Sequence, residues 1–213
     1  MGLRPLLDHD DVDIRLAAFE ALEQRRDPIV LSYDIDQKFT LNLVPSETPM
    51  IYVSQTGEPR IVLFGKALEV ERPMFIEAWS DRLLMKADTP TEELEVFFRE
   101  GEGVPPQTDM VSPDVAELIA YLGHKSTIEA PAPGIGLSYG ETIGAIHQLW
   151  RNGYIEADFK AEQDQVLAAI VRAQQFEESE DRPEFESDIV EPEEDEDPDV
   201  PSTVDRPGQG QIG

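Results

Sequence analysis

The chain has 213 residues, no cysteine and a net charge of −28, and its hydrophobic share of 40% is below that of an average globular protein. This large negative charge argues against nucleic acids and anionic membrane surfaces as partners, because binding to either requires basic side chains. The lack of cysteine excludes disulfides, thiolate catalysis and cysteine-ligated zinc. No apolar run reaches the roughly 18 residues of a membrane helix, and the first residues lack the apolar region of a signal peptide.

Residues 1–28 predict a helical hairpin. Its second helix is indicated by apolar side chains at helical spacing. Asp11 or Asp13 can cap the start of this helix, and Pro28 follows its end. The expected buried stripe consists of Ile14, Ala17, Ala18, Ala21 and Leu22.

The residue order in this hairpin is Leu-Leu-Asp, an acidic turn, Val-x-x-Arg-x-x-Ala and then Asp-Pro, and it resembles one HEAT repeat. The first helix is short, covering residues 3–7 with Pro5 inside it. Because a HEAT unit cannot bury its apolar face alone, the resemblance implies either missing neighbouring repeats or docking onto the next domain. We expect an exposed apolar edge for a neighbour at Leu3, Leu6 and Leu7.

Residues 29–100 predict a small antiparallel β sandwich or barrel. Short apolar runs follow one another without intervening helices, and residues 56–59 and 79–82 have the composition of hairpin turns. Since neighbouring residues of a strand face opposite sides, we expect Phe97 in the core and Phe98 on an outer contact face. The predicted strands cover residues 29–35, 39–44, 50–54, 60–64, 68–71, 74–79, 82–86 and 94–99.

The third part, residues 101–178, is predicted to be helical after a linker over residues 101–106. The expected helices run from Ser112 to about residue 122, from Ser138 to about residue 152, and from Lys160 to about residue 178. Ser112 with Pro113 provides the start signal of the first.

Residues 179–213 predict a disordered acidic tail, because they contain too few apolar side chains to offset the entropy of ordering. From residue 176 onward the chain has 15 acidic and two basic side chains, which leaves a net charge of −15 on the preceding residues. The tail is expected to solvate the chain, attract a basic partner or fold on binding. Its only apolar island contains Ile189 and Val190, the candidate docking residues.

A catalytic motif also occurs, since residues 136–140 read Gly-Leu-Ser-Tyr-Gly and match the G-x-S-x-G nucleophile elbow. The elbow needs a preceding strand and a histidine base on a separate loop. Here the preceding residues are rich in proline, and the only downstream histidine, His147, is predicted on the same helix. Ser138 and Glu141 instead have the spacing of a capping box. A serine hydrolase using Ser138 is therefore an alternative, and the main prediction is that the chain is not an enzyme.

No cofactor and no metal site are predicted. The glycines of residues 134–140 are not followed by the lysine of a P-loop. The acidic residues that begin at Asp8 fail the EF-hand pattern, because its sixth position is Asp13 rather than glycine. His9, His124 and His147 have no paired metal-ligand spacing, so surface or capping roles are expected.

Four short segments, residues 45–46, 49–52, 59–65 and 132–139, are similar to the C-terminal extension of flagellar P-ring-type proteins from planctomycete-like bacteria. This resemblance implies a periplasmic, non-enzymatic component of the flagellar basal body and transfers no catalytic residue. Without it, a cytoplasmic location is expected.

The sequence thus predicts an α+β protein with a structural or adaptor function. A general protein-interaction module with an acidic docking tail is a further alternative. Protein partners are expected, without nucleic acid or membrane insertion.

Overall fold

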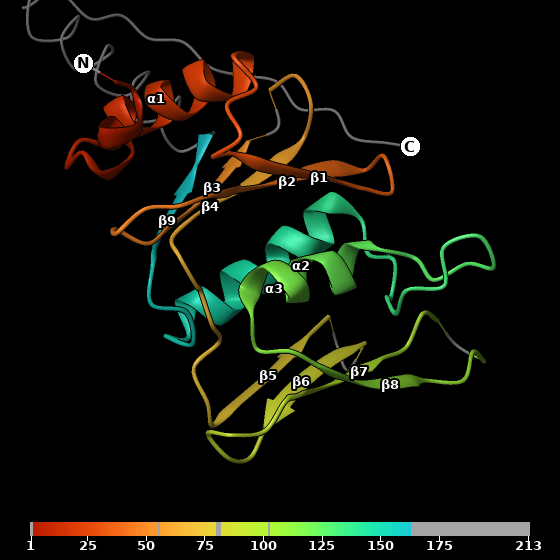
Figure 1. The fold of residues 1–213 in the computed structure, drawn as a ribbon. Coiled ribbons are helices and arrows are strands. Elements are labelled where there is room, and N and C mark those ends of the chain that lie inside the picture. Colours follow the sequence, from red (N-terminus) through yellow and green to blue (C-terminus); the bar gives the residue numbers. More distant parts are fainter. Residues whose placement is uncertain (1, 55, 80–81, 102, 163–213) are drawn as a thin grey trace, which may run out of the picture. The chain divides into compact units, whose positions relative to one another are not determined.

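A computed structural model describes residues 2–54, 56–79, 82–101 and 103–162 (Figure 1). The predicted α+β class is confirmed, because two separate sheets occur alongside helices. The third predicted helix beyond Glu162 and the acidic tail lie outside the described residues. The helices are the 3-10 helix η1 (Arg4–Asp8), α1 (Val12–Gln24), α2 (Val115–Gly123) and α3 (Tyr139–Arg151). The strands are β1 (Leu31–Ile35), β2 (Phe39–Val44), β3 (Met50–Ser54), β4 (Arg60–Phe64), β5 (Met74–Ala78), β6 (Leu83–Ala87), β7 (Leu94–Phe98), β8 (Gln107–Val111) and β9 (Asp158–Ala161).

The first sheet is mixed and has the strand order β1-β2-β4-β3-β9. Two of its pairings, β2 with β4 and β3 with β9, are parallel, and the other two are antiparallel. The second sheet is an antiparallel meander with the order β5-β6-β7-β8. The predicted hairpins that join β3 to β4 and β5 to β6 are confirmed by their antiparallel pairing.

The prediction of an antiparallel sandwich or barrel is wrong. Helices α2 and α3 separate the two sheets, with α2 against β2 and β8 and α3 against β5 (Figure 1). Both sheets and both helices contribute to one hydrophobic core. Residues assigned to separate β and helical segments therefore bury their apolar side chains together.

The central strands β3 and β4 have apolar side chains on both faces. Ile51 and Ile61 face the core shared with α2 and α3, while Met50 and Phe64 belong to a second core on the opposite face. This accounts for their continuous apolar runs, which are typical of strands covered on both sides. The first sheet is consequently the middle layer between α1 and the pair α2 and α3 (Figure 1).

The N-terminal helices cover the second core. The rings of Phe19 and Phe64 meet edge to face with their centroids 6.0 Å apart, and both side chains are fully buried. The predicted α1 stripe is wrong in part, because Ile14 is exposed and Ala17 is also outside the core. The buried face consists of Arg15, Leu16, Ala18, Phe19 and Leu22. Because the buried face includes the charged Arg15, the pattern of apolar residues alone predicted a different face of the helix.

Arg15 ties the helices to the sheet through three hydrogen bonds. Its guanidinium donates to the Leu7 carbonyl at 3.0 Å, the Ser46 hydroxyl at 3.2 Å and the Thr48 carbonyl at 2.5 Å. Arg15 is only 2% exposed, so these acceptors replace the water that the charge loses. The N-terminal helices thus pack onto the first sheet.

Several predicted elements change. Residues 68–71 form an isolated bridge between Glu69 and Asp114 rather than a strand. Strand β8 follows the expected linker, and β9 overlaps the start of the helix expected from Lys160. The N-cap of α2 is Asp114, whose carboxylate accepts the amides of residues 116 and 117. Ser112 supports this cap by accepting the Asp114 amide. Asp11 caps α1, as one of the two predicted possibilities.

Candidate docking groove beside helix α2

The N-terminal edge predicted for a neighbour is largely covered. Leu7 is 1% exposed and lies in the second core, with Leu3 and Leu6 partly buried against it. The prediction of an exposed edge is therefore wrong at Leu7. The physical reason is that the first sheet itself supplies the covering surface, through residues such as Val44 and Phe64.

The faces predicted for Phe97 and Phe98 are reversed. Phe98 is 6% exposed and belongs to the main core, whereas Phe97 is partly exposed. Strand alternation fixes this choice, because Leu94 and Val96 are both fully buried and share the face of Phe98. Phe98 thus offers no outer contact face. The tail candidates Ile189 and Val190 lie outside the described residues.

Ser138 forms the predicted capping box. Its hydroxyl accepts the Glu141 amide at 3.3 Å and donates to the Glu141 carboxylate at 2.8 Å, and that carboxylate also accepts the Ser138 amide. These hydrogen bonds lower the pKa of Glu141 despite partial burial. Within the described residues, no histidine is a hydrogen-bond partner of Ser138. A Cβ at Gly140 would contact nothing within 4 Å, so this position lacks the close packing of an elbow glycine.

The three histidines have separate surroundings. His9 accepts the Asp11 amide at 3.0 Å, and His147 packs against the rings of Trp150 and Phe159. His124 follows α2 and contacts Asp36. In the described ranges, no group of histidine and carboxylate side chains is arranged to hold a metal ion.

Two cavities lie between the first sheet and helix α2, and we call them together the α2 groove. The first has a volume of about 330 Å³ and extends from Leu31 of β1 under Leu43 of β2 and Leu63 of β4 to Ala116 of α2. The second has a volume of about 380 Å³ and is lined by Ile35 and Ala120 among others. Since the two alanines are one helical turn apart, the cavities follow one another along α2.

Apolar side chains surround the groove without being covered. Leu31 and Tyr33 on β1 are 50% and 49% exposed, and Met110 on β8 is 57% exposed. Leu31, Tyr33 and Ile35 lie on one face of β1, because side chains alternate along a strand. Only Ile35 at the end of this row is buried. The row therefore continues the core outward to the edge of the sheet.

The charged lining of the second cavity is mainly acidic. Asp36 and Glu117 contribute carboxylate side chains to it, Asp34 borders it from strand β1, and His124 is the one basic group among its described lining residues. Glu117 is exposed on α2, and no ion pair or hydrogen bond of its carboxylate occurs among the described residues. In the first cavity, Lys66 is paired with Glu47. The groove thus offers negative charge to a ligand.

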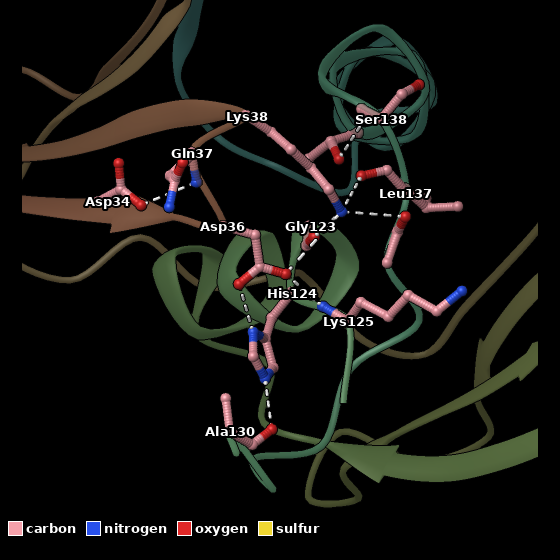
Figure 2. Close-up of polar contacts among 12 residues, drawn as sticks. Asp34, Asp36, Gln37, Lys38, Gly123, His124, Lys125, Ala130, Leu137 and Ser138 are labelled. Carbon is pink, nitrogen blue, oxygen red and sulfur yellow. Dashed lines mark hydrogen bonds and ion pairs between the residues drawn. The ribbon is translucent and has the colours of Figure 1, made fainter. Parts of the chain in front are cut away.

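Asp36 and His124, which line the second cavity, belong to a polar cluster at the tip of the β1–β2 hairpin (Figure 2). Asp36 accepts the Lys125 amide at 2.7 Å and contacts the His124 ring nitrogen Nδ1 at 2.8 Å. His124 Nε2 lies 3.2 Å from the Ala130 carbonyl. Partial burial raises the pKa of the Asp36 carboxyl, but the hydrogen bonds from Lys125 and His124 outweigh it, so the pKa is lowered.

Lys38 completes this cluster from the same hairpin. Its Nζ donates to the carbonyls of Gly123 at 2.7 Å, Gly136 at 3.1 Å and Leu137 at 3.2 Å (Figure 2). Gly123 is the last residue of α2, where positive charge is favourable, and the other two acceptors lie just before α3. The turn itself requires positive φ at both Asp36 and Gln37, as in a type I′ turn. The cluster fixes β1 relative to α2.

Helix α2 approaches the hairpin closely at its last residue. A Cβ at Gly123 would lie 2.7 Å from the Phe39 ring and 2.8 Å from Ile35, closer than side chains pack. The absence of a side chain at this position therefore lets α2 reach the sheet.

The sequence patterns did not reveal the lining residues Leu31, Met110 and Glu117 or the exposed Tyr33 beside them. One signal was present, because Leu31, Tyr33 and Ile35 alternate with polar residues in a strand that contains neither lysine nor proline. That pattern is typical of a half-buried strand, but it does not tell whether the strand lies at the edge of a sheet.

Comparisons of the chain with family models, with curated proteins and with solved structures find no match. Within the described residues, none of the helices combines the length and apolar character needed to cross a membrane.

Proposed function

We propose that the chain is a non-enzymatic adaptor whose α2 groove binds a segment of a partner protein with apolar and basic side chains. The observation that carries the proposal is the row of exposed apolar residues, Leu31 and Tyr33, beside an acid-lined groove at the edge of a sheet. A free strand edge that carries exposed apolar side chains is a template for pairing with another chain.

Charge favours this partner over occupants supplied by the chain itself. A second copy would bring a further net charge of −28 to the groove, and the residues from 176 onward carry 15 acidic against two basic side chains. Either would add negative charge beside Asp36 and Glu117. A basic segment instead gains attraction and faster association from the same field.

The test uses the full chain and arrays of synthetic peptides that alternate leucine or valine with either lysine and arginine or glutamate. We expect the basic peptides to bind and the acidic ones not to bind. The change Tyr33→Asp should abolish binding, because it places a charge in the apolar row. A matched control is Phe75→Asp, since Phe75 is 55% exposed on β5, an edge strand of the other sheet. Equal loss of binding in both variants, or equal binding of both peptide classes, would contradict the proposal.

Two earlier alternatives remain predictions. The hypothesis of a serine hydrolase predicts that Ser138 reacts with an activated fluorophosphonate probe and that Ser138→Ala abolishes the labelling. The capping contacts of Ser138 support the opposite result. The flagellar resemblance predicts co-purification with basal-body components, and no contact of the groove depends on it.

A further inference from the structure

We infer that the partner segment binds as an additional β-strand along the free edge of β1, with two apolar side chains four residues apart in the two cavities of the α2 groove. This inference rests on the proposed function and specifies its geometry. It differs from docking of a partner helix, which would fill the groove with side chains at i, i+3 or i+4 and i+7.

The edge of β1 is open in the described part of the chain. Strand β1 is terminal in its sheet and pairs only with β2, in the register that opposes Tyr33 to Leu41. Proteins usually protect such an edge with lysine, proline or a bulge. The β1 sequence Leu-Ser-Tyr-Asp-Ile has neither lysine nor proline, and its pairing with β2 is regular over all five residues. A row of backbone donors and acceptors is therefore available to another strand.

The two cavities match the repeat of a strand. Leu31 lines the first cavity and Ile35 lines the second, and four residues of a strand span roughly 13 Å. A segment paired with β1 has nearly the same rise per residue. Its side chains at i and i+4 would enter the two cavities, and that at i+2 would lie beside Tyr33.

Charge predicts what the intervening positions contain. Asp34 lies on β1 between the residues of the apolar row, so its side chain belongs to the opposite face of the strand. Side chains at i+1 and i+3 of the bound segment would share that face, where lysine or arginine is favoured beside Asp34. Glu117 on α2 favours a further basic side chain at the end of the segment nearest the second cavity.

The first experiment compares two synthetic peptides of equal composition and charge by calorimetry with the full chain. One is Arg-Leu-Lys-Val-Lys-Leu-Arg, with apolar residues at i, i+2 and i+4. The other is Arg-Leu-Lys-Lys-Val-Arg-Leu, in which that alternation is broken. We expect the alternating peptide to bind at least about ten-fold more tightly, because only it places two leucines in the cavities at once.

The second experiment tests the backbone pairing itself. Single N-methyl groups are placed at successive residues of the alternating peptide, each of which removes one N–H donor. In a strand, alternate N–H groups point toward β1, so binding should fall about ten-fold or more at every second position and change little between them.

The outcomes separate this inference from the proposed function. If both peptides bind equally and Tyr33→Asp still abolishes binding, the adaptor proposal stands and strand addition is overturned. A uniform effect of N-methylation along the peptide would also overturn strand addition. If neither peptide binds the chain at all, the proposed function and the inference both fail.

Discussion

The two faces of the five-stranded sheet differ in how completely their apolar side chains are buried. On the α1 face, Phe19 and Phe64 are completely buried, and the charged Arg15 has three hydrogen-bond acceptors. On the α2 face, the core is equally dense at β3 and β4 but thins toward β1, where Leu31 and Tyr33 are about half exposed. The apolar side chains of the sheet are thus buried on the α1 face, whereas two of those on the α2 face are half exposed at β1.

This difference separates residues that hold the fold together from residues that are free to bind. Truncating a buried side chain loses transfer free energy and leaves a cavity. Truncating a half-exposed side chain at a sheet edge loses little transfer free energy and leaves no enclosed cavity, so it should lower the stability much less. Stability measurements on both faces can therefore test whether the open edge is a surface for partners.

The largest effect is expected for Phe19→Ala. It removes a fully buried ring from the α1 face and its edge-to-face contact with Phe64. The free energy of unfolding should fall by about 3–5 kcal/mol, as measured by equilibrium unfolding in urea. The control Phe75→Ala removes an exposed ring and should cost about 0.5 kcal/mol or less. Similar losses in the two variants would mean that α1 does not seal this face.

A somewhat smaller loss is expected for Arg15→Ala. The change removes the charged donor from the buried Leu7 carbonyl and from the part-buried Thr48 carbonyl, and leaves only the single Ser46 hydroxyl near both, which should lower the free energy of unfolding by about 2–4 kcal/mol. Arg25, exposed at the end of the same helix, provides the matched control Arg25→Ala. The result would be contradicted if Arg15→Met were more stable than the wild type, because desolvation of the charge would then outweigh its hydrogen bonds.

The polar cluster around Asp36 predicts that the free energy of unfolding depends on pH in the acidic range. The pKa of Asp36 is lowered in the folded chain, so its stabilisation is present above the unfolded pKa and is lost as the pH falls through the lower, folded pKa. We expect Asp36→Asn to cost about 1 kcal/mol near neutral pH and to lose less stability than the wild type on acidification below about pH 4. Urea unfolding at a series of pH values measures both. Parallel pH profiles would contradict the role of Asp36.

The smallest effect on stability is expected at the open edge. Tyr33→Ser removes a side chain that is already half exposed, so the free energy of unfolding should change by about 0.5 kcal/mol or less. The same variant should lose binding of the alternating basic peptide. A loss of stability comparable to that of Phe19→Ala would show that Tyr33 belongs to the core rather than to a binding surface.

The sequence predicted the local elements better than their partners. Strands β2, β3 and β4 match their predicted bounds, and the capping box at Ser138 was recognised from two residues. The parallel pairings of β2 with β4 and of β3 with β9 were missed, because periodicity reports which faces a strand buries and not which strand lies beside it. The groove was missed for the same reason, since an edge is a property of the whole sheet.

Gly123 has a consequence for which partners the groove accepts. It is absent from the lining of both cavities, yet its lack of a side chain determines how near α2 stands to Ile35 at the second cavity. A methyl group there would push the end of the helix outward and widen that cavity while leaving its lining side chains unchanged. Selectivity for the size of the second anchor could thus be altered from a position that never touches the ligand, with Gly123→Ala favouring larger anchors such as phenylalanine.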